Sequence, residues 1–172
     1  MSDKNKRPAK QWIVICYGNI LRSQVLEQYL RYYAEKYELN IEFSSAGIAN
    51  QDEFPNTNIL LEEIRQELHK RVIPCALNRN TWDNVVEAKI ESADIVICAD
   101  SSVKATVLKR MNSRIDKEKV FTFYGMISEG EIDFEDTYDY EKKRQDPIRF
   151  KNAFDELDRI ARRILSQSKI SL

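Results

Sequence analysis

Residues 11–23 read QWIVICYGNILRS and contain three kinds of sequence in order. The first part, Gln11 to Cys16, is a short apolar run, which is typical of a buried strand. Gly18 and Asn19 then favour a tight turn, because both residue types adopt a positive φ more readily than other residues do. Apolar residues at helical spacing follow the turn, at Val25, Leu26, Tyr29, Leu30 and Tyr33. The segment therefore predicts a strand, a loop and a helix.

The rest of the chain repeats this alternation. The other predicted strands are Asn40 to Ser44, Asp94 to Cys98 and Val120 to Phe123. Three more helices are predicted. One contains Ile59 to Leu68, one begins at Ser101 or Ser102, and one follows the Asp146-Pro147 pair. Alternating strands and helices imply right-handed crossovers and a parallel sheet. We therefore expect an α/β fold, a doubly wound four-stranded parallel sheet with helices on both faces.

The length of the chain, 172 residues, is that of one ordinary domain. Met1 to Lys10 is polar and basic, so we expect a flexible tail there and a single domain over residues 11–172. The tail lacks the apolar stretch of a secretory signal, and no segment reaches the roughly 20 apolar residues that span a bilayer. We expect a cytoplasmic monomer without a membrane partner.

Charge and cysteine content exclude several kinds of partner. The 27 basic and 28 acidic side chains nearly cancel, which argues against nucleic acid as a partner. Cys16, Cys75 and Cys98 show no Cys-x-x-Cys spacing, which favours free thiols in a reducing compartment. His69 is the only histidine, so the sequence offers no zinc-type ligand cluster. We expect no metal and no cofactor.

Cys16 to Ser23 carries the chemistry. A thiol and a guanidinium stand at the two ends of a short loop, at the carboxyl end of a strand, where ligands of parallel sheets bind. Backbone N–H groups of such a loop, together with a helix N-terminus, form an anion nest that also stabilises a thiolate. We expect Cys16 to be the nucleophile and Arg22 to bind phosphate in a bidentate manner. The predicted phosphate-binding residues are Tyr17, Gly18, Asn19, Ile20, Leu21, Arg22 and Ser23.

Residues 13–23 resemble the signature of the low-molecular-weight protein-tyrosine-phosphatase family. Ser45-Ala46-Gly47 and Ala93 to Asp100 resemble further stretches of that family, and Arg79 falls where the family often has an arginine. The resemblance implies hydrolysis of phosphotyrosine in protein substrates through a phosphocysteine intermediate. It also implies phosphate or vanadate as the active-site anion and a reaction without a metal.

The resemblance leaves the general acid open. The family places it in Asp-Pro-Tyr, whereas this chain has Asp136-Thr137-Tyr138 and, separately, Asp146-Pro147. We favour Asp136 as the catalytic acid, because Phe134 and Tyr138 keep the family's order of apolar residue, acid and aromatic residue. Asp146 precedes a proline and an apolar helix, which is typical of an N-cap.

Three tyrosines are candidates for the walls of the substrate pocket, namely Tyr17, Tyr138 and Tyr140. Folded over the loop, their rings would form a slot deep enough for a phosphorylated phenol.

Departures from the family pattern keep other functions open. Gln24 and Thr137 each stand where the family has a proline. Leu21 stands in place of a second loop cysteine, so a protective disulfide with Cys16 is not expected. One alternative is a phosphoarginine phosphatase of the same fold, although relatives with that activity carry a small polar residue where this chain has Ile20. The other alternative is a non-catalytic module that binds phosphopeptides or anions.

Overall fold

The computed structural model describes residues 8–130 and 132–168. Four strands form one parallel sheet in the order β2-β1-β3-β4. Their bounds are β1 (Lys10–Cys16), β2 (Ile41–Gly47), β3 (Ile95–Cys98) and β4 (Val120–Thr122). The predicted doubly wound parallel sheet is confirmed.

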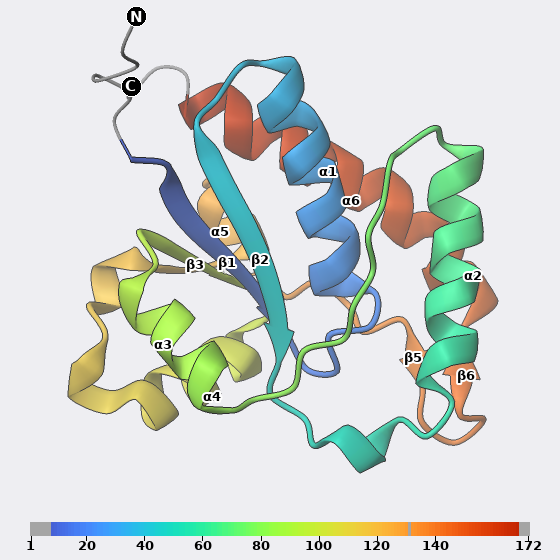
Figure 1. The fold of residues 1–172 in the computed structure, drawn as a ribbon. Helices are drawn as coiled ribbons and strands as arrows, with labels where there is room; N and C mark the ends of the chain where they lie inside the picture. Colours follow the sequence, from blue (N-terminus) through green and yellow to red (C-terminus); the bar gives the residue numbers. More distant parts are fainter. Residues whose placement is uncertain (1–7, 131, 169–172) are drawn as a thin grey trace, which may run out of the picture.

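Helices cover both faces of the sheet (Figure 1). The longer ones are α1 (Arg22–Lys36), α2 (Thr57–Lys70), α3 (Asn84–Ser92), α4 (Ser101–Met111) and α6 (Pro147–Ser168). One face packs against α1 and α6, with α2 beyond them, and the other face packs against α3 and α4. The short helix α5 (Phe123–Met126) follows β4.

Strand β1 lies in the middle of the molecule and explains the apolar run of the sequence. Every side chain from Trp12 to Cys16 is buried. Val14 and Cys16 join the cluster under α1 and α6, whereas Ile13 and Ile15 join the cluster under α3 and α4. A strand covered on both faces needs apolar residues at successive positions, not at alternate ones. Cys16, its last residue, thus emerges at the carboxyl edge of the sheet.

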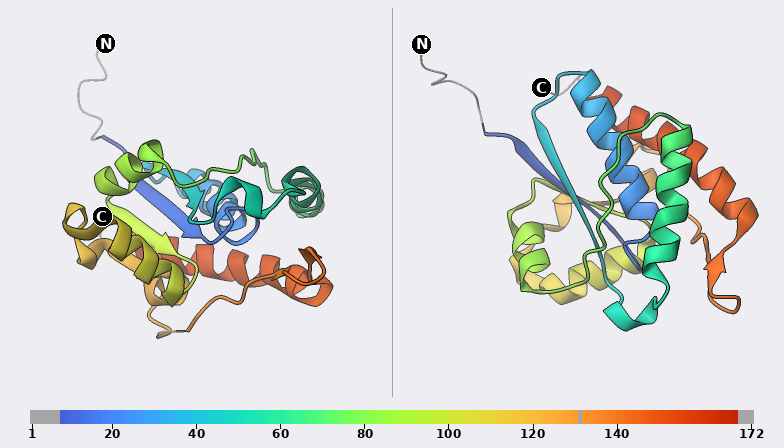
Figure 2. Two further views of the ribbon diagram at one scale, coloured as in Figure 1. Left: turned by 90° about the horizontal axis from the view of Figure 1, so that it is seen from below. Right: turned by 45° about the vertical axis from the view of Figure 1, so that its right-hand side comes forward.

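In the part of the chain that the structure describes, three short 3₁₀ helices and one hairpin complete the fold. The 3₁₀ helices are Gln51–Glu53, Asn112–Arg114 and Lys117–Lys119. Strands β5 (Tyr138–Asp139) and β6 (Arg144–Gln145) pair in antiparallel fashion. Figure 2 shows this hairpin at the first turn of α6. The loop predicted before the last helix therefore contains structure of its own.

Some predicted boundaries were wrong. Strand β2 continues to Gly47, beyond the predicted end at Ser44. Phe123 is the first residue of α5, not the end of a strand, because Thr122 caps that helix by accepting the Gly125 N–H. Helix α3 was missed, because Val86 and Ile90 are its only buried residues and give a weak helical pattern.

The predicted N-terminal tail, Met1 to Lys10, falls largely outside the described residues. Its last residue belongs to β1, where Lys10 pairs with Ile41. Within residues 8–130 and 132–168, no helix has the length and apolar character required to cross a membrane.

Candidate active site

The loop between β1 and α1 curls around the sulfur of Cys16. The backbone N–H of Asn19 donates to Cys16 Sγ at 3.2 Å, and the Ser23 Oγ lies 2.9 Å from the same sulfur. Cys16 and Ser23 are both buried. Donors to sulfur stabilise a thiolate, and the thiolate is the form of cysteine that acts as a nucleophile.

Asn19 holds the curl of the loop. Its φ angle is 50°, a left-handed conformation that asparagine tolerates better than most residues. Its amide Nδ2 donates to Ser23 Oγ at 2.8 Å and to Ser45 Oγ at 2.9 Å, and its Oδ1 accepts the Asn80 N–H at 2.7 Å. The amide thus joins the loop to β2 and to the segment before α3. The predicted positive φ is confirmed for Asn19.

Gly18 and Gly47 provide space around the loop. Gly18 does not have the positive φ that its residue type suggested. A Cβ at Gly18 would lie 2.8 Å from the Phe54 ring, and one at Gly47 would lie 2.7 Å from the Asn19 nitrogen. Both distances are too short for real Cβ contacts. The glycines allow an aromatic ring and the end of β2 to approach the loop backbone.

Gln24, which departs from the family pattern, braces the loop. Its Nε2 donates to the Asn19 carbonyl at 2.8 Å, and its Oε1 accepts the Asn78 N–H at 2.9 Å. The side chain is buried, so both amide ends are satisfied inside the protein. Arg79 adds a second brace, because its Nε donates to the Gly18 carbonyl at 2.9 Å and its guanidinium lies over the Phe54 ring.

Arg22 is buried and donates to acceptors from two other segments of the chain. Its Nη1 donates to Asp100 at 2.7 Å and to the Phe134 carbonyl at 3.1 Å, and its Nη2 donates to Asp136 at 3.3 Å. Burial alone would lower the pKa of Arg22, but the negative charges of Cys16 and Asp136 outweigh it and the pKa is raised. Arg22 is therefore a fixed positive charge beside the sulfur.

Asp136 and Asp146, the two candidates for the acid, occupy different environments. The Asp136 carboxylate faces Arg22 and accepts the Tyr140 hydroxyl at 3.0 Å. The Asp146 carboxylate accepts the backbone N–H groups of Ile148 and Arg149, at 3.1 and 2.9 Å. Asp146 thus caps α6, and of the two only Asp136 lines the pocket that contains Cys16.

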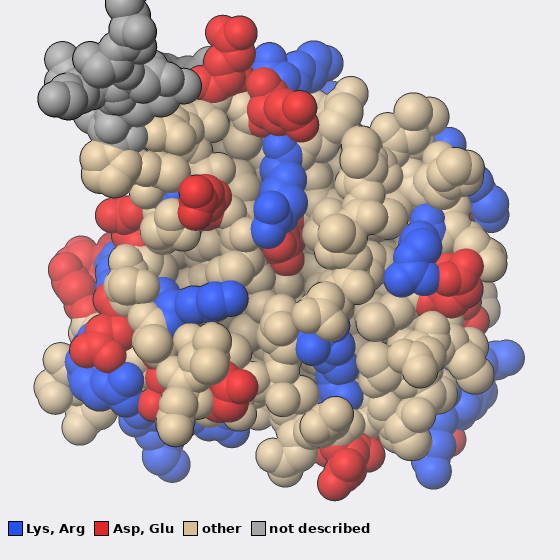
Figure 3. All heavy atoms as spheres, in the orientation of Figure 1, with Lys and Arg blue, Asp and Glu red and all other residues tan. Residues whose placement is uncertain are grey.

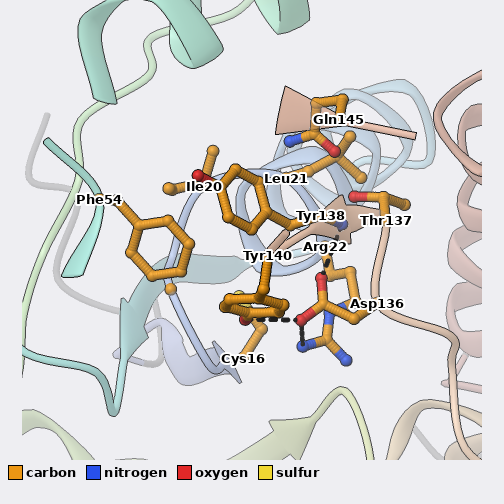
Figure 4. Close-up of a pocket in the computed structure, with 11 residues that line it drawn as sticks. Cys16, Ile20, Leu21, Arg22, Phe54, Asp136, Thr137, Tyr138, Tyr140 and Gln145 are labelled. Carbon is orange, nitrogen blue, oxygen red and sulfur yellow. Dashed lines mark hydrogen bonds and ion pairs between the residues drawn. The ribbon is translucent and has the colours of Figure 1, made fainter. Parts of the chain in front are cut away.

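The pocket above Cys16 has an apolar and aromatic wall (Figure 4). Tyr138 and Tyr140, two of the three tyrosines singled out in the sequence, line it. Tyr17 does not line it. The Tyr17 ring packs edge-on against Tyr140, and its hydroxyl donates to Glu53. The residues that line the pocket are Cys16, Gly18, Ile20, Leu21, Arg22, Phe54, Asp136, Thr137, Tyr138, Tyr140 and Gln145.

Phe54 and Gln145 were missed by the sequence analysis. Phe54 follows β2, and the loops after the carboxyl ends of parallel strands lie at one edge of the sheet. The position of Phe54 after a strand could therefore have predicted its place near the pocket. Gln145 carried none, because it reaches the pocket only through its pairing with Tyr138 in the hairpin. Its Oε1 is buried, and no donor from the described residues reaches it.

The remaining candidate groups lie away from the pocket. Cys98 is fully buried, and burial raises the pKa of its thiol. Cys75 is half-buried, and burial also raises its pKa. His69 is exposed on α2. On the face drawn in Figure 3, basic and acidic side chains of the described residues are interspersed and form no continuous basic surface.

Comparisons with known proteins agree with this geometry. The sequence model of the family "Low molecular weight phosphotyrosine protein phosphatase" matches residues 11–170. No curated protein sequence matches the chain significantly.

Solved structures show the same fold. A YwlE mutant from Bacillus subtilis has a TM-score of 0.73 at 24% identity, covering 94% of this chain and 99% of that one. A YwlE arginine phosphatase from Geobacillus stearothermophilus has 0.68 at 22%, covering 94% of each chain. A low molecular weight phosphotyrosine phosphatase from Vibrio cholerae has 0.73 at 19%, covering 94% and 97%.

Proposed function

The chain belongs to the low molecular weight phosphotyrosine protein phosphatase family, and on this premise we propose that it hydrolyses phosphotyrosine in proteins through a phosphocysteine on Cys16. One observation carries the proposal. A buried sulfur in hydrogen-bond contact with the Asn19 N–H and the Ser23 hydroxyl, a buried guanidinium and an aspartate carboxylate lie at a single pocket with an aromatic wall. In the proposed reaction these groups take every role, and no metal or cofactor is invoked.

In the first step, the Cys16 thiolate attacks phosphorus and the bond from phosphorus to the phenolic oxygen breaks. Arg22 and the loop N–H groups bind the remaining phosphoryl oxygens, whose charge they stabilise during transfer. Asp136, protonated at this stage, donates its proton to the departing phenolic oxygen. A tyrosyl leaving group has a pKa of about 10, so a positioned acid accelerates its departure.

In the second step, water attacks phosphorus and the bond between phosphorus and sulfur breaks. Asp136, now ionised, accepts the proton from this water. The electron pair returns to Cys16, where the Ser23 hydroxyl, 2.9 Å away, stabilises the thiolate as it leaves. Inorganic phosphate is released, and the site regains its starting protonation state.

The wall of the pocket favours an aromatic substrate. Ile20, Phe54 and Tyr138 present apolar and aromatic surface above the loop. A phosphotyrosine ring packs against such rings in edge-to-face or offset geometry. Phosphoserine is shorter, and its side chain would bring polar backbone into this apolar slot.

One observation favours phosphoarginine as a second candidate substrate. The Oε1 of Gln145 is buried at the pocket without a donor, and an unpaired buried acceptor costs free energy unless a ligand satisfies it. A phosphorylated guanidinium offers N–H donors beside the phosphate, whereas a phosphorylated phenol offers none. Structural neighbours of this chain include proteins described as arginine phosphatases.

Rates on matched peptides test the proposal. Peptides of one sequence carrying phosphotyrosine or phosphoarginine are incubated with the protein and a metal chelator, and phosphate release is followed over many turnovers. We expect faster release from phosphotyrosine, inhibition by vanadate and no release by Cys16→Ser. If phosphate release from phosphoarginine were faster and were lost in Gln145→Met, phosphoarginine would replace phosphotyrosine as the proposed substrate. Tight binding without release would favour the non-catalytic module.

A further inference from the structure

The Tyr140 hydroxyl is aimed at the carboxylate of Asp136. It donates to Oδ2 at 3.0 Å, the same oxygen that receives Arg22 Nη2 at 3.3 Å. The other oxygen, Oδ1, accepts the backbone N–H of Tyr138 at 3.1 Å. Figure 4 shows the three donors around the two oxygens of this carboxylate. These donors together fix the orientation of the Asp136 carboxylate.

Three aromatic rings fix the position of the Tyr140 ring. Its centroid lies 4.9 Å from that of Tyr138, 6.1 Å from that of Phe54 and 6.3 Å from that of Tyr17. Tyr17 is itself held, because its hydroxyl donates to Glu53. These aromatic contacts orient the Tyr140 ring and its hydroxyl, although 50% of the residue's surface is exposed.

The Tyr140 hydroxyl also keeps its proton and therefore remains a hydrogen-bond donor. Burial and the neighbouring charge of Asp136 raise the pKa of Tyr140, so its proton stays in place at neutral pH and above. Arg22 is different, because the phosphate of a substrate competes with Asp136 for its Nη2. Once phosphate occupies the loop, Tyr140 and the Tyr138 N–H are the remaining donors to the Asp136 carboxyl group.

We propose that Tyr140 is a positioning residue that keeps Oδ2 of Asp136 turned toward the leaving oxygen after phosphate has displaced Asp136 from Arg22. The inference rests on the proposed role of Asp136 as the general acid. The Tyr140 hydroxyl supplies no proton to the substrate. It sets the direction from which Asp136 delivers one.

The test separates proton delivery from binding by changing the leaving group. Tyr140→Phe keeps the ring and removes the hydroxyl. A phosphotyrosine peptide needs a proton on its leaving oxygen, whereas dinitrophenyl phosphate has a far more acidic leaving group and needs little help. We expect Tyr140→Phe to lower kcat/KM about tenfold on the peptide, the effect of one hydrogen bond, and to leave dinitrophenyl phosphate little changed. KM for the peptide stays close to that of the wild type.

Two control variants are available in the chain. Tyr33→Phe removes a tyrosine hydroxyl that donates to Asp158 at 2.5 Å, between α1 and α6, and should change neither rate. In Asp136→Asn there is no acid to position. Adding Tyr140→Phe to that background should therefore cost nothing further on the peptide, which a double-mutant cycle measures directly.

Several results would overturn the inference alone. They are an equal loss on both substrates, a loss that persists in the Asp136→Asn background, and a gain on both substrates, which would make Tyr140 a steric gate. If the wild type hydrolyses both substrates and Asp136→Asn costs nothing, the acid is another group and the inference fails with it. A wild type inactive on both substrates would overturn the proposed function itself.

Discussion

Ser23 places its hydroxyl oxygen 2.9 Å from the Sγ atom of Cys16, and both side chains are buried. The Asn19 amide also donates to this hydroxyl oxygen, at 2.8 Å. With that donor occupying one lone pair, the Ser23 proton is free to point at sulfur. In the proposed reaction, the arrangement stabilises a thiolate both before attack on phosphorus and after release of phosphate.

Replacing Ser23 by alanine removes this hydrogen bond. Loss of a bond to a charged sulfur in a buried site costs about 1.5 to 3 kcal/mol, which corresponds to a fall in kcat of roughly 10- to 100-fold. The second step should slow most, because the thiolate is its leaving group, so a burst of phenol should precede steady turnover in stopped-flow records. Ser166→Ala, on the exposed face of α6, is the control. An unchanged kcat and no burst would contradict the role of Ser23.

Alanine substitutions of Asp136 and Asp146 should affect different properties, namely the rate of catalysis and the stability of the fold. Asp136→Ala should lower kcat on a phosphotyrosine peptide by about 10² to 10⁴, the usual contribution of a general acid. Asp146→Ala should keep kcat and lower the free energy of unfolding by about 1 kcal/mol, because the cap of α6 is lost. The measurements are steady-state kinetics and urea denaturation. If the two phenotypes were exchanged, Asp146 would be the acid.

The loop should collapse when Asn19 is replaced by alanine. The variant loses three side-chain hydrogen bonds and keeps a left-handed backbone that alanine disfavours. We expect a loss of about 2 to 4 kcal/mol of stability together with a large fall in kcat. Asn112→Ala is a matched control, because Asn112 is exposed and also has a positive φ, of 49°. Equal losses in both variants would mean that backbone strain, not the network, accounts for the effect.

The three thiols should differ in reactivity. Burial raises the pKa of Cys98, so below that pKa it is a protonated thiol, and an alkylating agent cannot reach it in the folded protein. Burial raises the pKa of Cys75 as well, which lowers its thiolate fraction at neutral pH. Cys16 is also buried, but its sulfur lines the pocket, so iodoacetate at pH 7 should modify Cys16 first and added phosphate should protect it. Peptide mass spectrometry measures the order of modification. Modification of Cys98 as fast as that of Cys16 would contradict the prediction.

The sequence was most informative where one short segment carries all the signals. The strand, the loop and the helix around Cys16 follow from local patterns, and these patterns place the thiol and Arg22 at one end of a parallel strand. Helix α6 was equally readable, because the Asp146-Pro147 pair and the apolar face that follows it are local features. Such elements depend little on the rest of the chain.

The sequence was least informative where distant segments meet. Gln145 lines the pocket only because β6 pairs with β5, and two-residue strands have no pattern of their own. Tyr17 was expected in the wall, but its ring packs edge-on against Tyr140 and lines an adjoining hollow instead. Gln24 broke the family pattern, yet its contacts with Asn19 and Asn78 show that an amide can brace the same loop. None of these contacts is visible in a local pattern.

The covalent intermediate is the most direct test of the proposed function. The protein is mixed with excess phosphotyrosine peptide, quenched with denaturant during turnover and digested, and the fragment that contains Cys16 is analysed by mass spectrometry. We predict one phosphoryl group on Cys16, a larger trapped fraction in Ser23→Ala, and neither phosphorylated cysteine nor turnover in Cys16→Ser. Sustained turnover with an unmodified Cys16, or full activity in Cys16→Ser, would contradict the proposal.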